Sequence, residues 1–186
     1  MKNDEPEKKR RGRAKLALLA LFFLLPVGAS YLIWWLDLAP GTTGNYGTLL
    51  QPQRVILPAA GELKGKWVLV QFDGGACNAG CERKLYFMRQ VRRAQNREMQ
   101  RVARLWLLTD NVQPRPELLK AIEGTVVAPR AGIDAANAAF PAERSVTDHL
   151  YLVDPLGNLM MRFPPDPDPA RVIKDLQRLL KASSFG

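Results

Sequence analysis

The feature that most constrains this chain is an apolar stretch at residues 16–36, LALLALFFLLPVGASYLIWWL, whose single ionisable group is the phenol of Tyr31. About 20 apolar residues in a helix cross the hydrocarbon core of a bilayer, which is roughly 30 Å thick. A cleaved signal peptide is the alternative, but its apolar region is usually only about 7 to 15 residues long and ends at a small-residue site. The sequence WWLDLAPG offers no convincing site of that kind. We therefore predict that residues 16–36 form an uncleaved transmembrane helix.

The positive charge of the chain is concentrated beside this stretch. The formal net charge is +9, and the basic residues of the N-terminal segment crowd between Lys8 and Lys15. Basic residues flanking a membrane span favour the cytoplasmic side, so topology accounts for the cluster without a nucleic-acid partner. Acidic residues among the first seven argue against a mitochondrial transit peptide. We expect a single-pass protein of the bacterial inner membrane, with a cytoplasmic N-terminus and a periplasmic C-terminal domain.

Composition divides the chain into four segments. Residues 1–15 form the basic cytoplasmic tail, and residues 16–36 form the span and contact the lipid bilayer. Residues 37–61 contain several Gly and Pro residues and are typical of a tether and lead-in. Residues 62–186 are enough for one folded domain.

Apolar periodicity and turn signals in residues 62–186 predict alternating strands and helices. In chain order these are a buried strand at 66–72, a helix at 79–100, a buried strand at 102–110, a short helix at 115–124, two strands around a type I turn at 154–157, and a helix capped by Asp168. Two parallel strands joined by a crossover helix, then an antiparallel hairpin and a last helix, are the order of a thioredoxin-like fold. The predicted class is α/β: a thioredoxin-like domain, with a mixed central sheet and helices on both faces, tethered by one N-terminal transmembrane helix.

The two cysteines, Cys77 and Cys81, fall where the first strand meets the first helix. A thiol at a helix N-terminus is close to the positive end of the helix dipole, and Arg83 and Lys84 add positive charge, so both effects favour the thiolate. Residues four apart on a helix share a face, which would bring both sulfurs within reach of one metal ion or of each other. A structural disulfide in an exported domain is the other interpretation, although so small a closed loop adds little stability.

His149 is the only histidine and comes immediately before the predicted third strand. In a thioredoxin-type sheet, the loop entering that strand lies across from the loop that holds the cysteines. Two thiolates and one imidazole would then converge on a shallow surface site. Thiolates are soft ligands that favour Cu(I) and Zn, and a set of two cysteines and one histidine with an open position also suits copper.

These motifs resemble those of the Sco/SenC copper proteins, which assist the assembly of cytochrome c oxidase. The resemblance rests on the CxxxC of Cys77 and Cys81 after KGKWVLVQF and on TDHLYLVDPLGNLMMRF with His149, and it covers most of residues 61–180. It implies that Cys77, Cys81 and His149 are copper ligands, and that Asp148 matches the acidic residue preceding the histidine in the family. It also implies that copper is bound and that subunit II of cytochrome c oxidase is the partner. The family delivers copper to the binuclear centre of that subunit, or reduces its cysteines.

Two other functions stay open. The family commonly has proline after each cysteine, where this chain has Asn78 and Glu82. In a membrane-tethered thiol–disulfide oxidoreductase, the more exposed cysteine, which we expect to be Cys77, attacks a substrate disulfide and Cys81 resolves the mixed disulfide. His149 separates this function from copper binding, because dithiol exchange needs only the cysteines. In a non-catalytic assembly scaffold, neither the thiols nor the histidine would matter.

Overall fold

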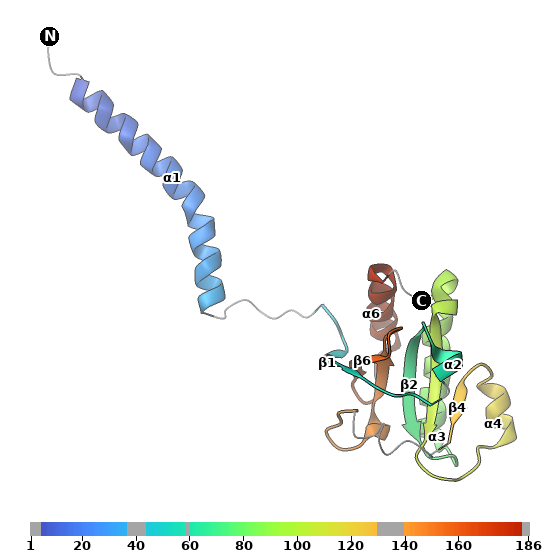
Figure 1. Ribbon diagram of the computed structural model, residues 1–186. Coiled ribbons are helices and arrows are strands. Elements are labelled where there is room, and N and C mark those ends of the chain that lie inside the picture. The colour runs from blue at the N-terminus through green and yellow to red at the C-terminus, as the bar shows by residue number, and fades with distance from the viewer. Residues whose placement is uncertain (1–4, 37–43, 59, 130–139, 184–186) are drawn as a thin grey trace. The chain divides into compact units, whose positions relative to one another are not determined.

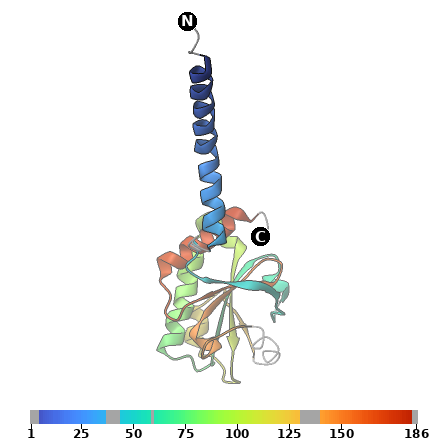
Figure 2. The same cartoon turned by 90° about the vertical axis from the view of Figure 1, so that its left-hand side faces the viewer.

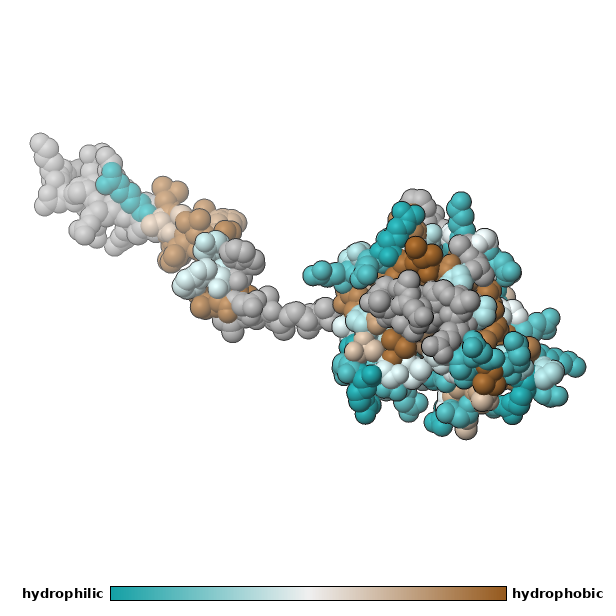
Figure 3. Space-filling view, turned by 60° about the horizontal axis from the view of Figure 1, so that its bottom comes forward, coloured by the Kyte–Doolittle hydropathy of each residue, from teal (hydrophilic) through white to brown (hydrophobic). Residues whose placement is uncertain are grey.

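The computed structural model describes residues 5–36, 44–58, 60–129 and 140–183, and the chain falls into two compact units, Met1–Thr43 and Gly44–Gly186. In the first unit, helix α1 (Glu5–Trp35) includes Pro26 (Figure 1). Within the described residues, Lys15–Ile33 is the one stretch that is long and apolar enough to cross a membrane. Its large apolar side chains are exposed, as the brown atoms along the helix show (Figure 3). Residues 1–4 of the predicted tail and 37–43 of the predicted tether lie outside the described part.

The second unit is built on a mixed β-sheet. Its six strands, counted over the described residues, are β1 (Thr48–Arg54), β2 (Trp67–Asp73), β3 (Val102–Leu108), β4 (Val126–Ala128), β5 (Leu150–Val153) and β6 (Asn158–Phe163). They lie in the order β1-β6-β5-β2-β3-β4. β2, β3 and β4 are parallel, whereas β5 and β6 form an antiparallel hairpin and β1 pairs antiparallel with β6. β2 and β3 are covered on both faces, which explains their continuous apolar sequence.

Helices cover both faces of this sheet, as the predicted fold class requires. Among the described residues they are α2 (Ala60–Leu63), α3 (Ala79–Arg93), α4 (Pro116–Ala121) and α6 (Pro169–Ala182), with the 3₁₀ helices η1 (Asn96–Arg101) and η2 (Val146–Asp148) between them. α3 and α6 lie side by side (Figures 1 and 2). Together with α4 they bury apolar side chains in one core, which also contains Leu69 of β2. Leu63 of α2 belongs to the core on the opposite face, with Phe72 of β2.

The start of the second unit is attached to its last helix. Asp168 is the N-cap of α6, as predicted, and its side chain accepts a hydrogen bond from the backbone N–H of Ala170 at 2.9 Å. Two turns further along, the buried carboxylate of Asp175 accepts hydrogen bonds from the backbone N–H groups of Tyr46, at 2.7 Å, and Gly47, at 2.9 Å. A carboxylate that satisfies two backbone donors holds the segment before β1 against α6.

The predicted elements are present, and the structure differs from the prediction in several places. The helix predicted at 79–100 ends at Arg93, and η1 follows it. β1 lies within the predicted lead-in, so the folded unit takes in residues from Gly44 onward. β1 is largely exposed and contains Pro52, which suits an edge strand but gives no alternating pattern to read. β4 has only three residues, too few for a periodic signal.

Candidate functional site

Cys77 and Cys81 form a disulfide where β2 leads into α3, and their Cα atoms are 5.2 Å apart. Both residues are buried, with 4% of Cys77 and 1% of Cys81 exposed, so Cys77 is the slightly more accessible partner, as predicted. The expected placement of both on one helical face is wrong, because Cys77 precedes the N-cap residue Asn78 and has a φ of 43° that no helix accommodates. Asn78 Oδ1 accepts a hydrogen bond from the backbone N–H of Cys81 at 3.0 Å. The cap thus fixes Cys81 in the first turn of α3.

The loop before Cys77 is held by the segment that follows β3. The backbone N–H of Gly75 donates to Asp110 Oδ1 at 2.8 Å, and a Cβ at position 75 would overlap the carbonyl oxygen of Val112. The loop closes on itself through a hydrogen bond from the N–H of Cys77 to the carbonyl of Gly74, at 3.1 Å. Glycine is therefore required at position 75, where the two loops approach most closely.

A buried amide lies against the disulfide. Gln71 is fully buried in β2, and its Nε2 lies 3.5 Å from Cys81 Sγ and 3.4 Å from the carbonyl oxygen of Cys81. Its Oε1 is buried and makes no hydrogen bond within the described residues. The sequence analysis missed Gln71, although a polar residue inside the apolar strand KWVLVQF was a signal that something beside that strand needs a polar partner. An amide N–H aimed at sulfur favours the thiolate that reduction would produce.

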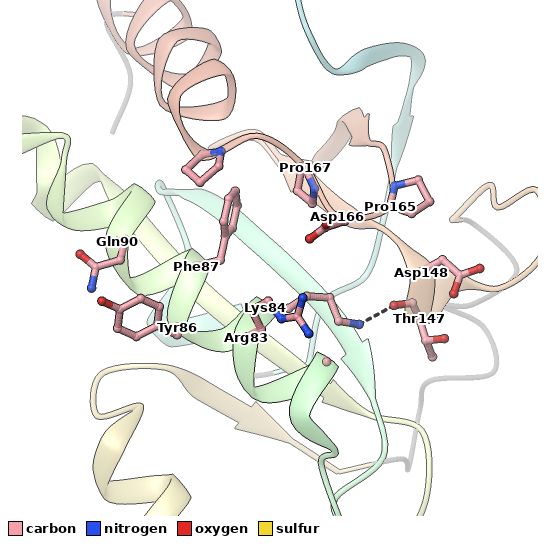
Figure 4. A pocket seen from close by; sticks show the side chains of 12 residues that line it. Arg83, Lys84, Tyr86, Phe87, Gln90, Thr147, Asp148, Pro165, Asp166 and Pro167 are labelled. Carbon is pink, nitrogen blue, oxygen red and sulfur yellow. Dashed lines mark hydrogen bonds between the residues drawn. The ribbon is translucent and has the colours of Figure 1, made fainter.

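Lys84 connects the cysteine helix to the segment before His149. Its Nζ forms a salt bridge with Asp73 Oδ2 at 2.8 Å and donates to the carbonyl of Thr147 at 2.5 Å, a contact drawn in Figure 4. The predicted positive charge near the thiols is therefore partly neutralised, since Asp73 pairs with Lys84. Arg83 is exposed. Because Lys84 bridges α3 and η2, the segment that leads into His149 lies beside α3.

His149 is buried, with 3% of the residue exposed, and follows η2 directly. Its Nδ1 lies 2.9 Å from the carbonyl oxygen of Phe163. A carbonyl oxygen only accepts, so Nδ1 carries the proton of the neutral ring and Nε2 has the free lone pair that a metal requires. The ring packs edge-on against Tyr151 at a centroid distance of 6.1 Å. Burial raises the pKa of Tyr151 to about 12, so its hydroxyl stays a donor to the carbonyl of Pro141.

The disulfide and His149 are not gathered into one cluster. Leu150 of β5 lies opposite Gln71 of β2, whose amide contacts Cys81. His149 is the residue before Leu150, so it lies one position away from the point opposite Gln71. Tyr151, against which His149 packs, belongs to the core on the face opposite the disulfide. In the part of the chain that the structure describes, no group of three or more His, Cys, Asp or Glu side chains is placed to hold a metal ion. The three-residue copper site stays a prediction.

A cavity of about 640 Å³ lies beside this corner (Figure 4). One wall is α3, including Gly80 between the two cysteines, and the opposite wall is formed by η2 and the proline-rich segment 165–169. Phe87 and Tyr86 contribute aromatic surface, and Tyr86 is largely exposed. The surface of the cavity is mainly apolar, and neither Cys77 nor Cys81 is among the residues that line it.

The order of strands and the disulfide at the end of β2 define a thioredoxin-like protein. Residues 67–183 match the family described as "transmembrane-like, thioredoxin-like, C-terminal domain". The match spans more than half of the chain, and the protein belongs to this family. No curated protein matches the sequence.

Solved structures with the same fold include several Sco proteins. Yeast Sco1 with copper bound is 13% identical, with a TM-score of 0.53, over 75% of this chain and 90% of that chain. Arabidopsis thaliana ScoI with copper bound is 16% identical, with a TM-score of 0.52, over 74% and 99%. Apo Sco1 from Thermus thermophilus is 17% identical, with a TM-score of 0.51, over 76% and 98%. The predicted resemblance to Sco/SenC proteins is thus confirmed in the fold.

Proposed function

We propose that this protein is a membrane-anchored copper-binding chaperone of the Sco/SenC type, which assists assembly of the copper centre of cytochrome c oxidase. The observation that carries the proposal is the Cys77–Cys81 pair where β2 leads into α3, the helix whose Lys84 contacts the segment leading into His149. The shared fold supports it, because yeast Sco1 and Arabidopsis ScoI hold copper.

The chemistry of the three side chains fits copper. Reduced Cys77 and Cys81 supply two soft thiolates, and the Nε2 lone pair of His149 supplies a borderline imidazole donor. Gln71 supports the sulfur of Cys81 by donating from its amide, as an outer residue that orients a ligand does. Copper is the cargo of this protein, and these groups would hold it between donor and acceptor.

Reduction must precede binding, because the two sulfurs are bonded to each other in the disulfide form. An external dithiol supplies two electrons: one of its thiolates attacks a sulfur of the pair, its second thiolate resolves the mixed disulfide, and the external dithiol leaves as a disulfide. The freed cysteines take up the two protons that the external dithiol loses. They release these protons again when a metal ion binds to the thiolates. His149 must then turn away from Tyr151 or the loop at 145–149 must shift, so that the imidazole reaches the thiolates.

The anchor and the partner complete the proposal. The apolar segment within α1 would hold the folded unit at the periplasmic surface of the bacterial inner membrane, with the basic N-terminal residues in the cytoplasm. Subunit II of cytochrome c oxidase is the proposed acceptor. The cavity lined by Tyr86 and Phe87 offers it a docking surface beside the cysteines.

A thiol–disulfide oxidoreductase is the second candidate, because His149 packs against Tyr151 on the other face while the cysteines already form a disulfide. In that reaction, the thiolate of Cys77 attacks a substrate disulfide and releases one substrate thiolate. Cys81 then attacks the sulfur of Cys77, which releases the second substrate thiolate and restores the disulfide. Copper plays no part in this cycle.

Metal analysis of the reduced full-length chain, purified in a nonionic detergent, tests the proposal. Wild-type protein should bind one copper ion per chain. Cys77→Ser or Cys81→Ser should remove most of it, because a hydroxyl replaces a soft thiolate. His149→Ala should weaken Cu(II) more than Cu(I), which two thiolates alone can hold. Met160→Leu, which removes a thioether outside the proposed set, is the matched control and should keep full stoichiometry.

The same variants separate the alternatives. An oxidoreductase predicts no stoichiometric copper in wild type, and undiminished disulfide exchange in His149→Ala. A scaffold predicts that neither the thiols nor the histidine affects oxidase assembly. Copper content that survives the loss of each cysteine in turn would remove the chaperone assignment.

A further inference from the structure

A second cavity, of about 220 Å³, lies at the end of α3 away from the cysteines. Five cationic side chains line it: Arg89, Arg92 and Arg93 of α3, Arg104 of β3, and Lys120 of α4. Glu123 is the single acidic residue of the lining. No ion pair found among the described residues involves any of the five cations. With five cations and one carboxylate in its lining, the cavity concentrates net positive charge in a small volume.

Arg104 is the unusual member of this group, because it is buried inside a central strand with only 2% of the residue exposed. Its Nη2 donates to the carbonyl oxygen of Glu123 at 2.7 Å. Its Nε and Nη1 are also buried, and they make no hydrogen bond to the part of the chain that the structure describes. A buried guanidinium with unused donors is unfavourable unless an acceptor reaches it.

The neighbouring arginines increase this demand for an anion. Arg89 donates to the carbonyl of Ala121 at 3.1 Å, and Arg92 donates to the carbonyl of Val102 at 2.7 Å, so neutral backbone acceptors hold both side chains at the cavity. Burial, and then the positive charges of Arg92, Arg89 and Arg93, lower the pKa of Arg104 to about 10. Negative charge in the cavity would relieve the repulsion among the arginines and would offset the cost of burying Arg104, because it favours the charged guanidinium.

We propose that the cavity between α3, α4 and the start of β3 binds a phosphate-type oxyanion. The buried Arg104 would hold the anion from inside the cavity, and the other four cations of the lining would surround it. Arginine suits this role because its planar group presents several donors to the oxygens of a phosphate. Arg93 and Lys120 are exposed, so the cavity is open to an anion from solution. The anion is either free phosphate or the phosphate of a lipid headgroup, since both present the same oxygens.

Thermal unfolding of the full-length chain, in a maltoside detergent and an amine buffer, tests the site with inorganic phosphate. Phosphate should raise the melting temperature saturably, whereas sodium chloride at matched ionic strength should not. Arg89→Gln and Lys120→Gln should each weaken the apparent affinity by about tenfold or more, because each removes a charge-assisted contact. Arg97→Gln removes an exposed charge of η1 outside the cavity and should leave the affinity within about twofold of wild type.

Arg104→Met gives an independent result. Without phosphate, the variant should melt at or above the wild-type temperature, because it removes a buried charge with unused donors, and phosphate should no longer raise its melting temperature. If this variant fails to fold, the two surface variants decide. A phosphate effect no larger than that of chloride, or an equal loss of affinity in Arg97→Gln, would overturn the proposal. Short-chain phosphatidic acid in the micelle, with phosphatidylcholine as its control, then identifies the source of the bound anion. If phosphatidic acid competes with free phosphate, the site binds a lipid headgroup. If it does not compete, the site binds the free anion.

Discussion

Reduction of the Cys77–Cys81 disulfide should weaken the folded unit only slightly. The two cysteines are separated by 4 positions in sequence, so the loop that the disulfide closes is very short. The chain-entropy relation gives about 2 kcal/mol for a loop of this length, compared with about 3 kcal/mol for a loop of 15 residues. Most of the packing around the cysteines is independent of the bond, because Cys81 is also fixed by the N-cap Asn78.

Backbone strain reduces this figure further. Cys77 has a φ of 43°, in the left-handed region that a side chain disfavours by roughly 1–2 kcal/mol. Reduction allows Cys77 to leave that conformation, so part of the lost stabilisation is returned. We expect the free energy of unfolding to fall by about 1–2 kcal/mol on reduction. For a domain of this size, the melting temperature should decrease by about 2–8 °C.

Thermal melts of the full-length chain with and without a small phosphine reductant measure this difference. The reductant needs time to act, because both sulfurs are nearly inaccessible. The double variant Cys77→Ser/Cys81→Ser is the control, and its melting temperature should be unaffected by the reductant. Unfolding of the domain on reduction, or a loss above about 5 kcal/mol, would contradict this reasoning and establish a structural disulfide.

Three further predictions concern other parts of the molecule. Gln71→Met should lower the reduction potential of the disulfide by about 20 mV in glutathione titrations. The variant loses an N–H···S contact that stabilises the reduced form by roughly 1 kcal/mol. An unchanged potential would exclude a role for the amide. Asp175→Ala should lower the free energy of unfolding, measured in urea, by roughly 3 kcal/mol, since it leaves the N–H groups of Tyr46 and Gly47 without an acceptor. Asp175→Asn should lower this free energy by less. A C-terminal reporter that is active only in the periplasm should be active in the fusion, and a reporter that is active only in the cytoplasm should not; the reverse pattern would refute the proposed topology.

Strong local patterns predicted much of the fold. The apolar runs of β2 and β3, the Asp154–Gly157 turn and the Asp168 cap all appear where the sequence places them, because each depends on neighbouring residues. β1 could not be read in this way, since its pairing with β6 depends on residues more than a hundred positions away. The sequence also placed the cysteine pair correctly between β2 and α3, although not the backbone conformation of Cys77, and its reactivity stays a prediction.

The sequence by itself determined the apolar span, the strand and helix order, and the position of the cysteines at the end of β2, because these follow from periodicity and residue spacing along the chain. Only the tertiary structure decided what surrounds the sulfurs and where the unmatched charges lie. Gln71 and Arg104 appear in the sequence as single polar residues within apolar strands. The role of each depends on its neighbours in the fold, which are a sulfur for Gln71 and three arginines for Arg104. The ring of His149 packs against Tyr151 and its Nδ1 bonds the carbonyl of Phe163, contacts that only strand pairing creates. Burial and long-range pairing set these environments, and neither is a property of the residues that carry the chemistry.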